Sequence, residues 1–255
     1  MIHPTAIIHP HAQIGQNCDI GPYCVIGENV VLGERCRLHS HVVIDGHTRL
    51  GHGNEIFPFA TIGLKTQDLK WKGGATRTQI GDNNTFREYV TINSATADGE
   101  ATVVGSNNHI LAYSHVAHNV NLGNGVIMSN VATLAGHIVV EDFAVVGGLA
   151  AVHQFCRIGK LSMIGGCSKV VQDVPPFMIV DGNPAETRTI NKVGMDRHGV
   201  PEETQTALRQ AFKLLFREGL TIPNALARIT AELPPSPELG HVVSFVRTSE
   251  RGISK

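Results

Sequence analysis

The 255-residue sequence lacks both a strong net charge and a long apolar segment. Lys and Arg together number 21 against 22 Asp and Glu, which leaves a formal charge of -1. A nearly neutral chain is not expected to bind nucleic acid or an anionic membrane surface through bulk charge. No apolar run reaches the roughly 20 residues that a membrane-spanning helix needs. We therefore expect no stable membrane insertion. Because the repeat described below begins at Ile2, we also expect no signal peptide and a cytoplasmic location.

Cysteine is scarce, and its spacing is not that of a disulfide framework. Four of the five cysteines, Cys18, Cys24, Cys36 and Cys156, occupy the fifth place of a six-residue repeat, where other repeats carry Ala, Ser, Thr or Val. Cys167 falls one place earlier. We interpret all five as packing residues with reduced thiols. We expect no metal site either, because no Asp, Glu or Cys pairing accompanies the histidines.

The sequence instead has a period of six in its apolar residues. Every sixth position from 2 to 62 is Ile or Leu, and the same phase continues to residue 170, broken only at Asp68, Gly74 and Asp98. Neither a helix nor an ordinary strand has this period, whereas a parallel β-helix of hexapeptide repeats does. Each repeat is one short strand plus a corner, and three repeats close a coil of about 18 residues. The periodic residues then point inward and form columns.

The period is interrupted twice and then stops. The tracts 63–79 and 93–103 leave the coil as loops, and beyond about residue 185 helical spacing replaces the repeat. We expect a short helix over 188–197 and longer helices from Pro201 to Gly219, near 223–233 and near 237–248. The sequence thus predicts a β-helical domain over 1–185 and an α-helical domain over 186–255. On the first long helix Arg209, Lys213 and Arg217 form a basic stripe, which suits a solvated face or a docking face equally well.

Three of the fourteen histidines share one edge of the predicted coil. His118, His137 and His153 lie in the hexapeptides that begin at 116, 134 and 152, one coil apart, and His115 precedes the first. Imidazole readily exchanges a proton near neutral pH. Both loop tracts leave hexapeptides of the same class, so loops and histidines converge on one candidate site. The alternative from another class is a catalytically inactive structural solenoid.

Seven short segments add a resemblance to a known family. They are Thr66-Gln67-Asp68-Leu69-Lys70, Ser114-His115-Val116-Ala117-His118, Leu134-Ala135-Gly136-His137, Val152-His153-Gln154-Phe155-Cys156, Gly165-Gly166-Cys167, Gln172-Asp173-Val174-Pro175-Pro176 and Asp181-Gly182-Asn183-Pro184. With them the chain resembles the UDP-N-acetylglucosamine O-acyltransferases, which open lipid A biosynthesis. The resemblance covers nearly the whole chain, including the helical tail.

The resemblance implies a left-handed β-helix, a homotrimer with active sites between subunits, and an enzyme. The implied reaction moves an (R)-3-hydroxyacyl chain from acyl carrier protein to the sugar 3-hydroxyl of UDP-N-acetylglucosamine. The carrier's phosphopantetheine holds the acyl group, and no further cofactor is implied. His118 matches the family's general base, the backbone N–H of Gly136 its oxyanion donor, and Gly166 the residue that caps the acyl groove and measures chain length.

Further roles follow by the same matching. The substrate-binding positions are Gln67, Asp68, Lys70, His115, His137, His153 and Gln154, with Asn191 and Arg197 facing the nucleotide. Arg209, Lys213 and Arg217 match a docking face for the acidic carrier protein. The chain departs from the best-known members at Asn119, where they have aspartate, at Asn93-Ser94, where many have His-Arg, and at His198, where they have arginine. An N-acyltransferase acting on a 3-amino sugar nucleotide, or on a later lipid A intermediate, is the alternative enzyme.

Overall fold

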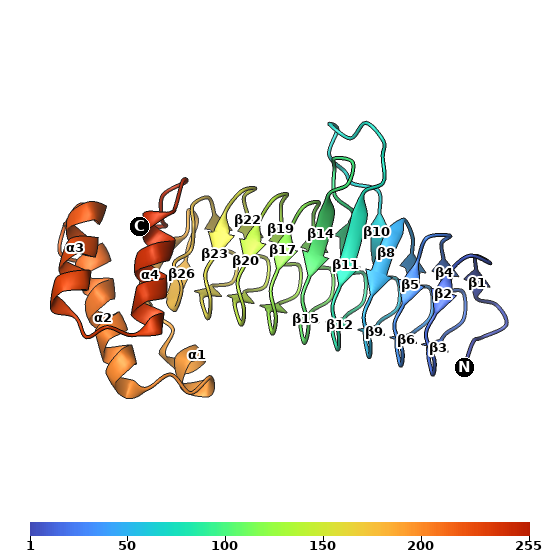
Figure 1. Cartoon of the computed structure of the whole chain (residues 1–255), viewed down its shortest axis with the longest axis horizontal. Coiled ribbons are helices and arrows are strands. Elements are labelled where there is room, and N and C mark those ends of the chain that lie inside the picture. Colours follow the sequence, from blue (N-terminus) through green and yellow to red (C-terminus); the bar gives the residue numbers. More distant parts are fainter.

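The computed structural model of the protein describes all 255 residues as a long coil of short strands with a group of helices at one end (Figure 1). The N-terminus lies at the end of the coil opposite the helices. Three flat faces run along the coil, and each face is one sheet whose neighbouring strands are parallel, apart from one terminal hairpin. Because each strand pairs with the strand one coil away, the fold is a parallel β-helix.

The strands of each face follow one another in steps of one coil. The first face contains β1 (Ile7–Ile8), β4 (Val25–Ile26), β7 (Val43–Ile44), β10 (Thr61–Leu64), β13 (Thr91–Asn93), β16 (His115–Val116), β19 (Thr133–Leu134), β22 (Ala151–Val152) and β25 (Lys169–Val170). The second face contains β2 (Gln13–Ile14), β5 (Val31–Leu32), β8 (His47–Leu50), β11 (Arg77–Ile80), β14 (Ala101–Val104), β17 (Asn121–Leu122), β20 (Val139–Val140) and β23 (Arg157–Ile158). The third face contains β3 (Asp19–Ile20), β6 (Arg37–Leu38), β9 (Glu55–Ile56), β12 (Thr85–Phe86), β15 (His109–Ile110), β18 (Ile127–Met128), β21 (Val145–Val146), β24 (Met163–Ile164), β26 (Met178–Asp181) and β27 (Glu186–Ile190).

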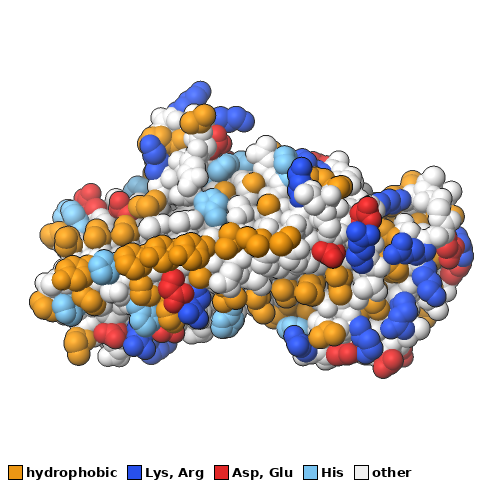
Figure 2. Space-filling view, turned by 180° about the vertical axis from the view of Figure 1, so that it is seen from behind, with side chains coloured by type: hydrophobic (Ala, Val, Ile, Leu, Met, Phe, Trp, Pro, Cys, Tyr) orange, Lys and Arg blue, Asp and Glu red, His pale blue; other side chains and the backbone are white.

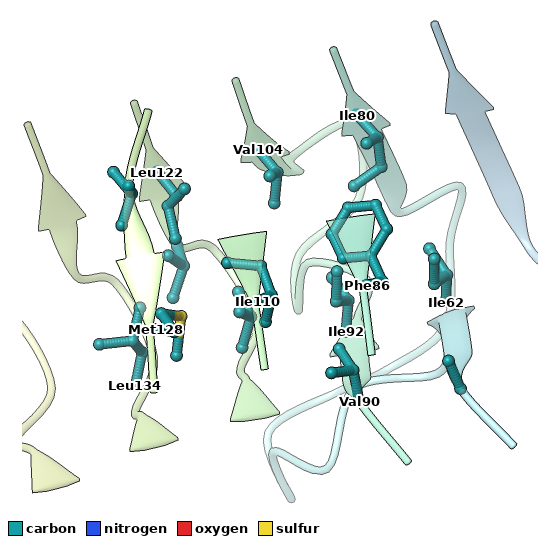
Figure 3. Packing of buried hydrophobic residues seen from close by; sticks show 14 of the residues in the cluster. Ile62, Ile80, Phe86, Val90, Ile92, Val104, Ile110, Leu122, Met128 and Leu134 are labelled. Carbon is teal, nitrogen blue, oxygen red and sulfur yellow. The ribbon is translucent and has the colours of Figure 1, made fainter. Parts of the chain in front are cut away.

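The periodic residues fill the interior of the coil, as the sequence predicts. Figure 3 shows Ile62, Ile92, Phe86 and Ile110 among the side chains that project inward from different faces and meet along the axis. The small residues of the fifth place, such as Ala60 and Val90, are buried beside them. The first coil has no coil beneath it, so Ile2 is 53% exposed although it follows the period.

Two loops leave the coil at the same corner. They connect β10 to β11 over residues 65–76 and β13 to β14 over residues 94–100, and they rise together above the coil in Figure 1. The strands on either side keep their pairing, with Thr61 opposite Thr91 and Thr91 opposite His115. The loops are therefore additions to an unbroken β-helix, placed where the first face turns into the second.

Four helices, α1 (Lys192–Arg197), α2 (Glu202–Phe216), α3 (Ile222–Glu232) and α4 (Pro237–Arg247), follow the coil. The last three begin and end within a few residues of the positions expected from the sequence. They bury a second apolar cluster that includes Leu208, Leu215 and Val242. None of the helices is both long and apolar enough to span a bilayer.

Two expectations are wrong in detail. The helix expected over 188–197 begins only at Lys192, because 186–190 is strand β27, paired antiparallel with β26. The expected packing role of Cys167 is also wrong, since this residue is exposed at a corner with φ of 59°. The other four cysteines are buried and free, and burial raises the pKa of Cys156 to about 11. The thiol of Cys156 therefore stays protonated at neutral pH.

The packing of the columns predicts a strong dependence on the large buried side chains. Phe86 is fully buried, so Phe86→Ala should lower the free energy of unfolding by roughly 3–5 kcal/mol. Leu69, which is 101% exposed in the 65–76 loop, provides the control, and Leu69→Ala should change stability by less than about 0.5 kcal/mol. Urea denaturation measures both. Equal losses for the two variants would contradict the column model of the core.

Candidate active site

A cavity of about 600 Å³ lies where the first face meets the 65–76 loop. Three successive coils and the loop contribute its walls. The lining residues are Gln67, Asp68, Leu69, Lys70, Asn93, His115, Ala117, His118, Thr133, Ala135, Gly136 and Gln154. Only three of these are hydrophobic. The cavity thus combines titratable side chains with a floor of short strands, which is the arrangement expected of a polar substrate site.

The repeat explains why His118, Gly136 and Gln154 share this cavity. Each is the third residue of its hexapeptide, counted from the buried Val116, Leu134 and Val152. Val116 pairs with Leu134, and Leu134 with Val152, so third-place residues stack from coil to coil. The stack carries a histidine, a residue without a side chain, and a glutamine.

The stack brings the imidazole of His118 against the backbone of Gly136. A Cβ added at Gly136 would lie 2.3 Å from Cε1 and 2.4 Å from Nε2 of His118. Any larger residue at position 136 would therefore displace the ring. The N–H of Gly136 makes no hydrogen bond within the chain, whereas the N–H groups of Ala135 and His137 bond to Val152 and His118. A free backbone donor thus lies beside an imidazole.

His118 has a polar partner on each ring nitrogen. Its Nδ1 lies 3.0 Å from Oδ1 of Asn119, and its Nε2 lies 3.7 Å from a carboxylate oxygen of Asp68. The 65–76 loop fixes Asp68, whose other carboxylate oxygen accepts the N–H of Lys70 at 2.9 Å. The side chains of His118 and Asp68 are both mostly buried. Nε2 is the nitrogen that faces the cavity.

Two neighbouring histidines are held in the neutral form. Burial, followed by the nearby charge of His118, lowers the pKa of His115, whose Nδ1 lies 2.7 Å from the hydroxyl of Thr91. The same two causes, in the same order, lower the pKa of His137. The ring of His137 contacts that of His118 edge-on at 5.1 Å and stacks on Phe155. Neutral neighbours can donate or accept hydrogen bonds without repelling a positive charge on His118.

Four of the predicted substrate-binding residues do not line the cavity. His137 is the fourth residue of its hexapeptide and sits on the corner with φ of 59°, behind His118. His153 lies one coil beyond Ala135 in the second-place column and is exposed. Asn191 caps α1 and is buried, its side chain bonded to the carbonyl of Leu161 and the N–H of Gly194. Arg197 is exposed in the last turn of α1. A single chain therefore does not bring Asn191 and Arg197 to the cavity.

The residues matched to the acyl chain and the carrier lie toward the helical end. Gly166 is exposed, and a Cβ added there would meet only the carbonyl oxygen of Gly148, at 3.3 Å. Arg209, Lys213 and Arg217 are exposed along α2, and Arg217 also donates to the carbonyl of Arg188. Figure 2 shows Lys and Arg side chains gathered over this end of the molecule. The basic stripe is thus accessible.

Two other features of the chain do not compete with this site. A larger cavity of about 760 Å³ between α3 and the C-terminal segment is lined mainly by apolar side chains, including Leu226, Val246 and Ile253. It contains no nucleophile, carboxylate or imidazole. His9, His11 and Glu28 bring three possible metal-ligand atoms within 4.8 Å of one another, a grouping that the sequence analysis did not expect. That group lies in the first two coils, far along the chain from His118.

The sequence analysis missed several lining residues that the period could have identified. Thr133 pairs directly with His115 one coil earlier, and Ala117 and Ala135 share the second-place column with Asn93. A count of 18 residues from each candidate, or 24 across the second loop, finds them. Leu69 has no such signal, because its place depends on the conformation of the 65–76 loop.

Comparison with known proteins gives the same result along the whole chain. A curated acyl-[acyl-carrier-protein]–UDP-N-acetylglucosamine O-acyltransferase from Thermodesulfovibrio yellowstonii is 51% identical over 86% of this chain and 85% of its own length. One from Gloeothece citriformis is 50% identical over 97% of this chain and 90% of its own. This chain belongs to the UDP-N-acetylglucosamine O-acyltransferase family.

Solved structures and family profiles agree with this assignment. The crystal structure of LpxA, a UDP-N-acetylglucosamine acyltransferase from Bacteroides fragilis, superposes with a TM-score of 0.97 at 42% identity, covering 100% of both chains. LpxA from Acinetobacter baumannii gives 0.96 at 43% identity, covering 100% of this chain and 99% of the other. The profile of UDP-N-acetylglucosamine O-acyltransferase domain 2 matches residues 173–254, and that of the GMPPB C-terminal domain matches residues 2–97. The expected left-handed parallel β-helix with a helical C-terminal part is thereby confirmed.

The lowered pKa of His115 predicts a pH-dependent loss of stability. As the pH falls through about 6.5, the unfolded chain takes up a proton that folded His115 resists, so the free energy of unfolding decreases. His115→Gln removes this group and should make the dependence shallower between about pH 8 and about pH 5.5. Urea denaturation at both pH values measures the slopes. His109→Gln, on the exposed side of β15, controls for the loss of an imidazole, and identical slopes for wild type and His115→Gln would contradict the interpretation.

Proposed function

We propose that the protein transfers an (R)-3-hydroxyacyl chain from acyl carrier protein to the 3-hydroxyl of UDP-N-acetylglucosamine, the first step of lipid A biosynthesis. Relatives at about 50% identity over most of the chain carry this activity in their names. The single observation that supports it most strongly within this chain is the pairing of His118 with the free N–H of Gly136. Acyl transfer needs a base and an oxyanion donor close to one point, and this cavity provides both.

The proposed steps use only these two groups and the substrates. Nε2 of His118 takes the proton of the sugar 3-hydroxyl while the oxygen attacks the thioester carbonyl. The N–H of Gly136 bonds the oxygen of the tetrahedral intermediate, and its collapse forms the ester and expels the phosphopantetheine thiolate. His118 then returns the proton to that sulfur. A general base contributes typically 10²–10⁴ in rate, and one oxyanion donor about 10²–10³. No further cofactor enters the proposal.

Polar residues around the base would hold the acceptor sugar. The carboxylate of Asp68, 3.7 Å from Nε2 of His118, lies where it can accept a hydrogen bond from a sugar hydroxyl. Gln67, His115 and Gln154 line the same wall. Lys70 carries a positive charge at the rim and suits a phosphate of the nucleotide or of phosphopantetheine.

We place Asn191 and Arg197 at the nucleotide of a neighbouring subunit's site, within a homotrimer. Their distance from the cavity of their own chain requires a second copy if they contact substrate. A row of hydrophobic side chains runs along the β-helix in Figure 2 and offers a surface for that copy. Its members occupy the corner between the third and first faces, where stacked rings include Phe59, Tyr89 and Tyr113. Exposed apolar rows of this length usually mark an interface.

The acyl chain and its carrier would approach from the helical end. Gly166 leaves the groove beside the first face open, so we propose that it accommodates a long hydroxyacyl chain. The stripe of Arg209, Lys213 and Arg217 would attract the acidic carrier protein and speed docking. The carrier and the sugar nucleotide are both cytoplasmic metabolites, so we propose the same location for the enzyme.

The proposed base predicts a large loss of activity on its removal. Incubation with 3-hydroxyacyl carrier proteins of several chain lengths and UDP-N-acetylglucosamine should give an acylated sugar nucleotide, and its mass gives the preferred length. His118→Ala should reduce turnover by at least about 10². Mild alkali should hydrolyse the product, because it is an ester, whereas an amide from a 3-amino sugar would survive.

His109→Ala, which removes an exposed imidazole from the third face, serves as the control and should keep the wild-type rate. Circular dichroism checks that both variants remain folded. A near-native rate for His118→Ala would exclude it as the base, and no acylated product from the wild type would contradict the proposed function.

The proposed trimer depends on the apolar corner. Tyr113→Glu places a charge in the middle of the row and should dissociate the trimer, as measured by light scattering after size exclusion, with activity lost in parallel. Tyr113→Phe keeps the stacked ring on Tyr89 and should remain trimeric. A wild type that is monomeric yet fully active would rule out the shared site.

A further inference from the structure

Asn119 follows His118 directly and is bonded on both ends of its amide. Its Oδ1 accepts the backbone N–H of Thr96 at 3.0 Å and also faces Nδ1 of His118 at 3.0 Å. Its Nδ2 donates to the carboxylate of Glu100 at 2.6 Å. A backbone N–H can only donate and an ionised carboxylate can only accept, so these partners fix which end of the amide is oxygen.

The fixed amide determines the tautomer of His118. Since Oδ1 of Asn119 is an acceptor, the Nδ1 atom that faces it must carry a proton. The lone pair of the neutral ring is then on Nε2, which points into the cavity. That is the tautomer a general base at this position needs. Glu100 contacts neither His118 nor the cavity, yet it holds the amide that selects the tautomer.

We propose that Glu100 is a positioning residue that acts through Asn119, holding His118 in the Nε2-basic tautomer and balancing the charge of its protonated form. This inference rests on the proposed function for its catalytic meaning. Most of the best-known family members place a carboxylate next to the catalytic histidine, whereas here the residue is a neutral asparagine. In this chain the carboxylate is one hydrogen bond further away, supplied by the 94–100 loop.

The loop is built to hold Glu100 in this place. The carboxylate of Glu100 accepts the N–H of Ala97 at 3.3 Å within the loop, and the N–H of Asn119 donates to the hydroxyl of Thr102 just beyond it, at 2.8 Å. Asn119 has φ of 60°, a corner conformation that asparagine tolerates well. The loop and the corner are therefore tied together by several bonds.

Other charged groups near His118 do not replace this role. Asp68 faces Nε2, the side that the acceptor hydroxyl must occupy, so it cannot stay bonded to the base while substrate is bound. Lys70 lines the same cavity and carries the opposite charge. His115 and His137, from the same face and the next coil, are neutral. Glu100 is the carboxylate on the Nδ1 side.

The test exchanges the amide and the carboxylate. Glu100→Gln keeps an acceptor for Asn119 but removes the charge, and it should lower kcat on the order of tenfold, less than the 10²–10⁴ of the whole base because Glu100 is exposed. KM should stay within about twofold, and the acid limb of the pH–rate profile should move to lower pH. Asn119→Asp alone sets two carboxylates against each other and should also be impaired. The double variant Glu100→Gln with Asn119→Asp restores one carboxylate and one amide and should recover most of the activity.

Asp98→Asn is the matched control in the same loop. Asp98 accepts the N–H of Ala75, a bond that asparagine can also make, so this variant loses a charge without touching the relay and should retain wild-type kcat. A wild-type kcat and pH profile for Glu100→Gln, or a double variant no better than either single one, would overturn the inference. Nitrogen-15 NMR of His118 in the wild type provides a readout that does not depend on activity. A proton on Nδ1 is expected, and a proton on Nε2 of the neutral ring would refute the relay even if the enzyme had another substrate.

Discussion

The parallel pairing of strands one coil apart is the constraint on which the whole molecule depends. Each strand is so short that the ladder and the inward column together fix its register. Val116 lies opposite Leu134, and Leu134 opposite Val152, at intervals of 18 residues. Across the loops the interval lengthens to 30 between Thr61 and Thr91 and to 24 between Thr91 and His115. The register survives because the additional 12 and 6 residues leave the coil at one corner.

The same constraint assembles the site. Third-place residues stack into His118, Gly136 and Gln154, so a base, a free backbone donor and an amide meet without any long-range folding of the chain onto itself. The loops then supply what a regular coil cannot. The 65–76 loop brings Asp68 to Nε2 of the base, and the 94–100 loop brings Glu100 to Asn119 on the opposite nitrogen. Scaffold and loops therefore divide the work between register and electrostatics.

Much of this could be predicted from the sequence, because a period of six fixes both the fold and the corner that each residue occupies. The convergence of His115, His118 and Gly136 with the 65–76 loop followed from that arithmetic. Direction within the hexapeptide did not, which is why His137 and His153 share the edge but do not line the cavity. The contact between Glu100 and Asn119 depends on a loop conformation that no periodicity encodes. Strand β27 was missed because its pairing with β26 follows a turn outside the repeat.

The central claim is that coil stacking creates one acyl-transfer site around His118. A crystal structure with bound UDP-N-acetylglucosamine tests it most directly. The account predicts the sugar in the 600 Å³ cavity, with its 3-hydroxyl within hydrogen-bond distance of Nε2 of His118 and the pyrophosphate leading toward a neighbouring copy. A nucleotide sugar bound in the apolar cavity beside α3, or in this cavity with its 3-hydroxyl turned away from His118, would contradict it.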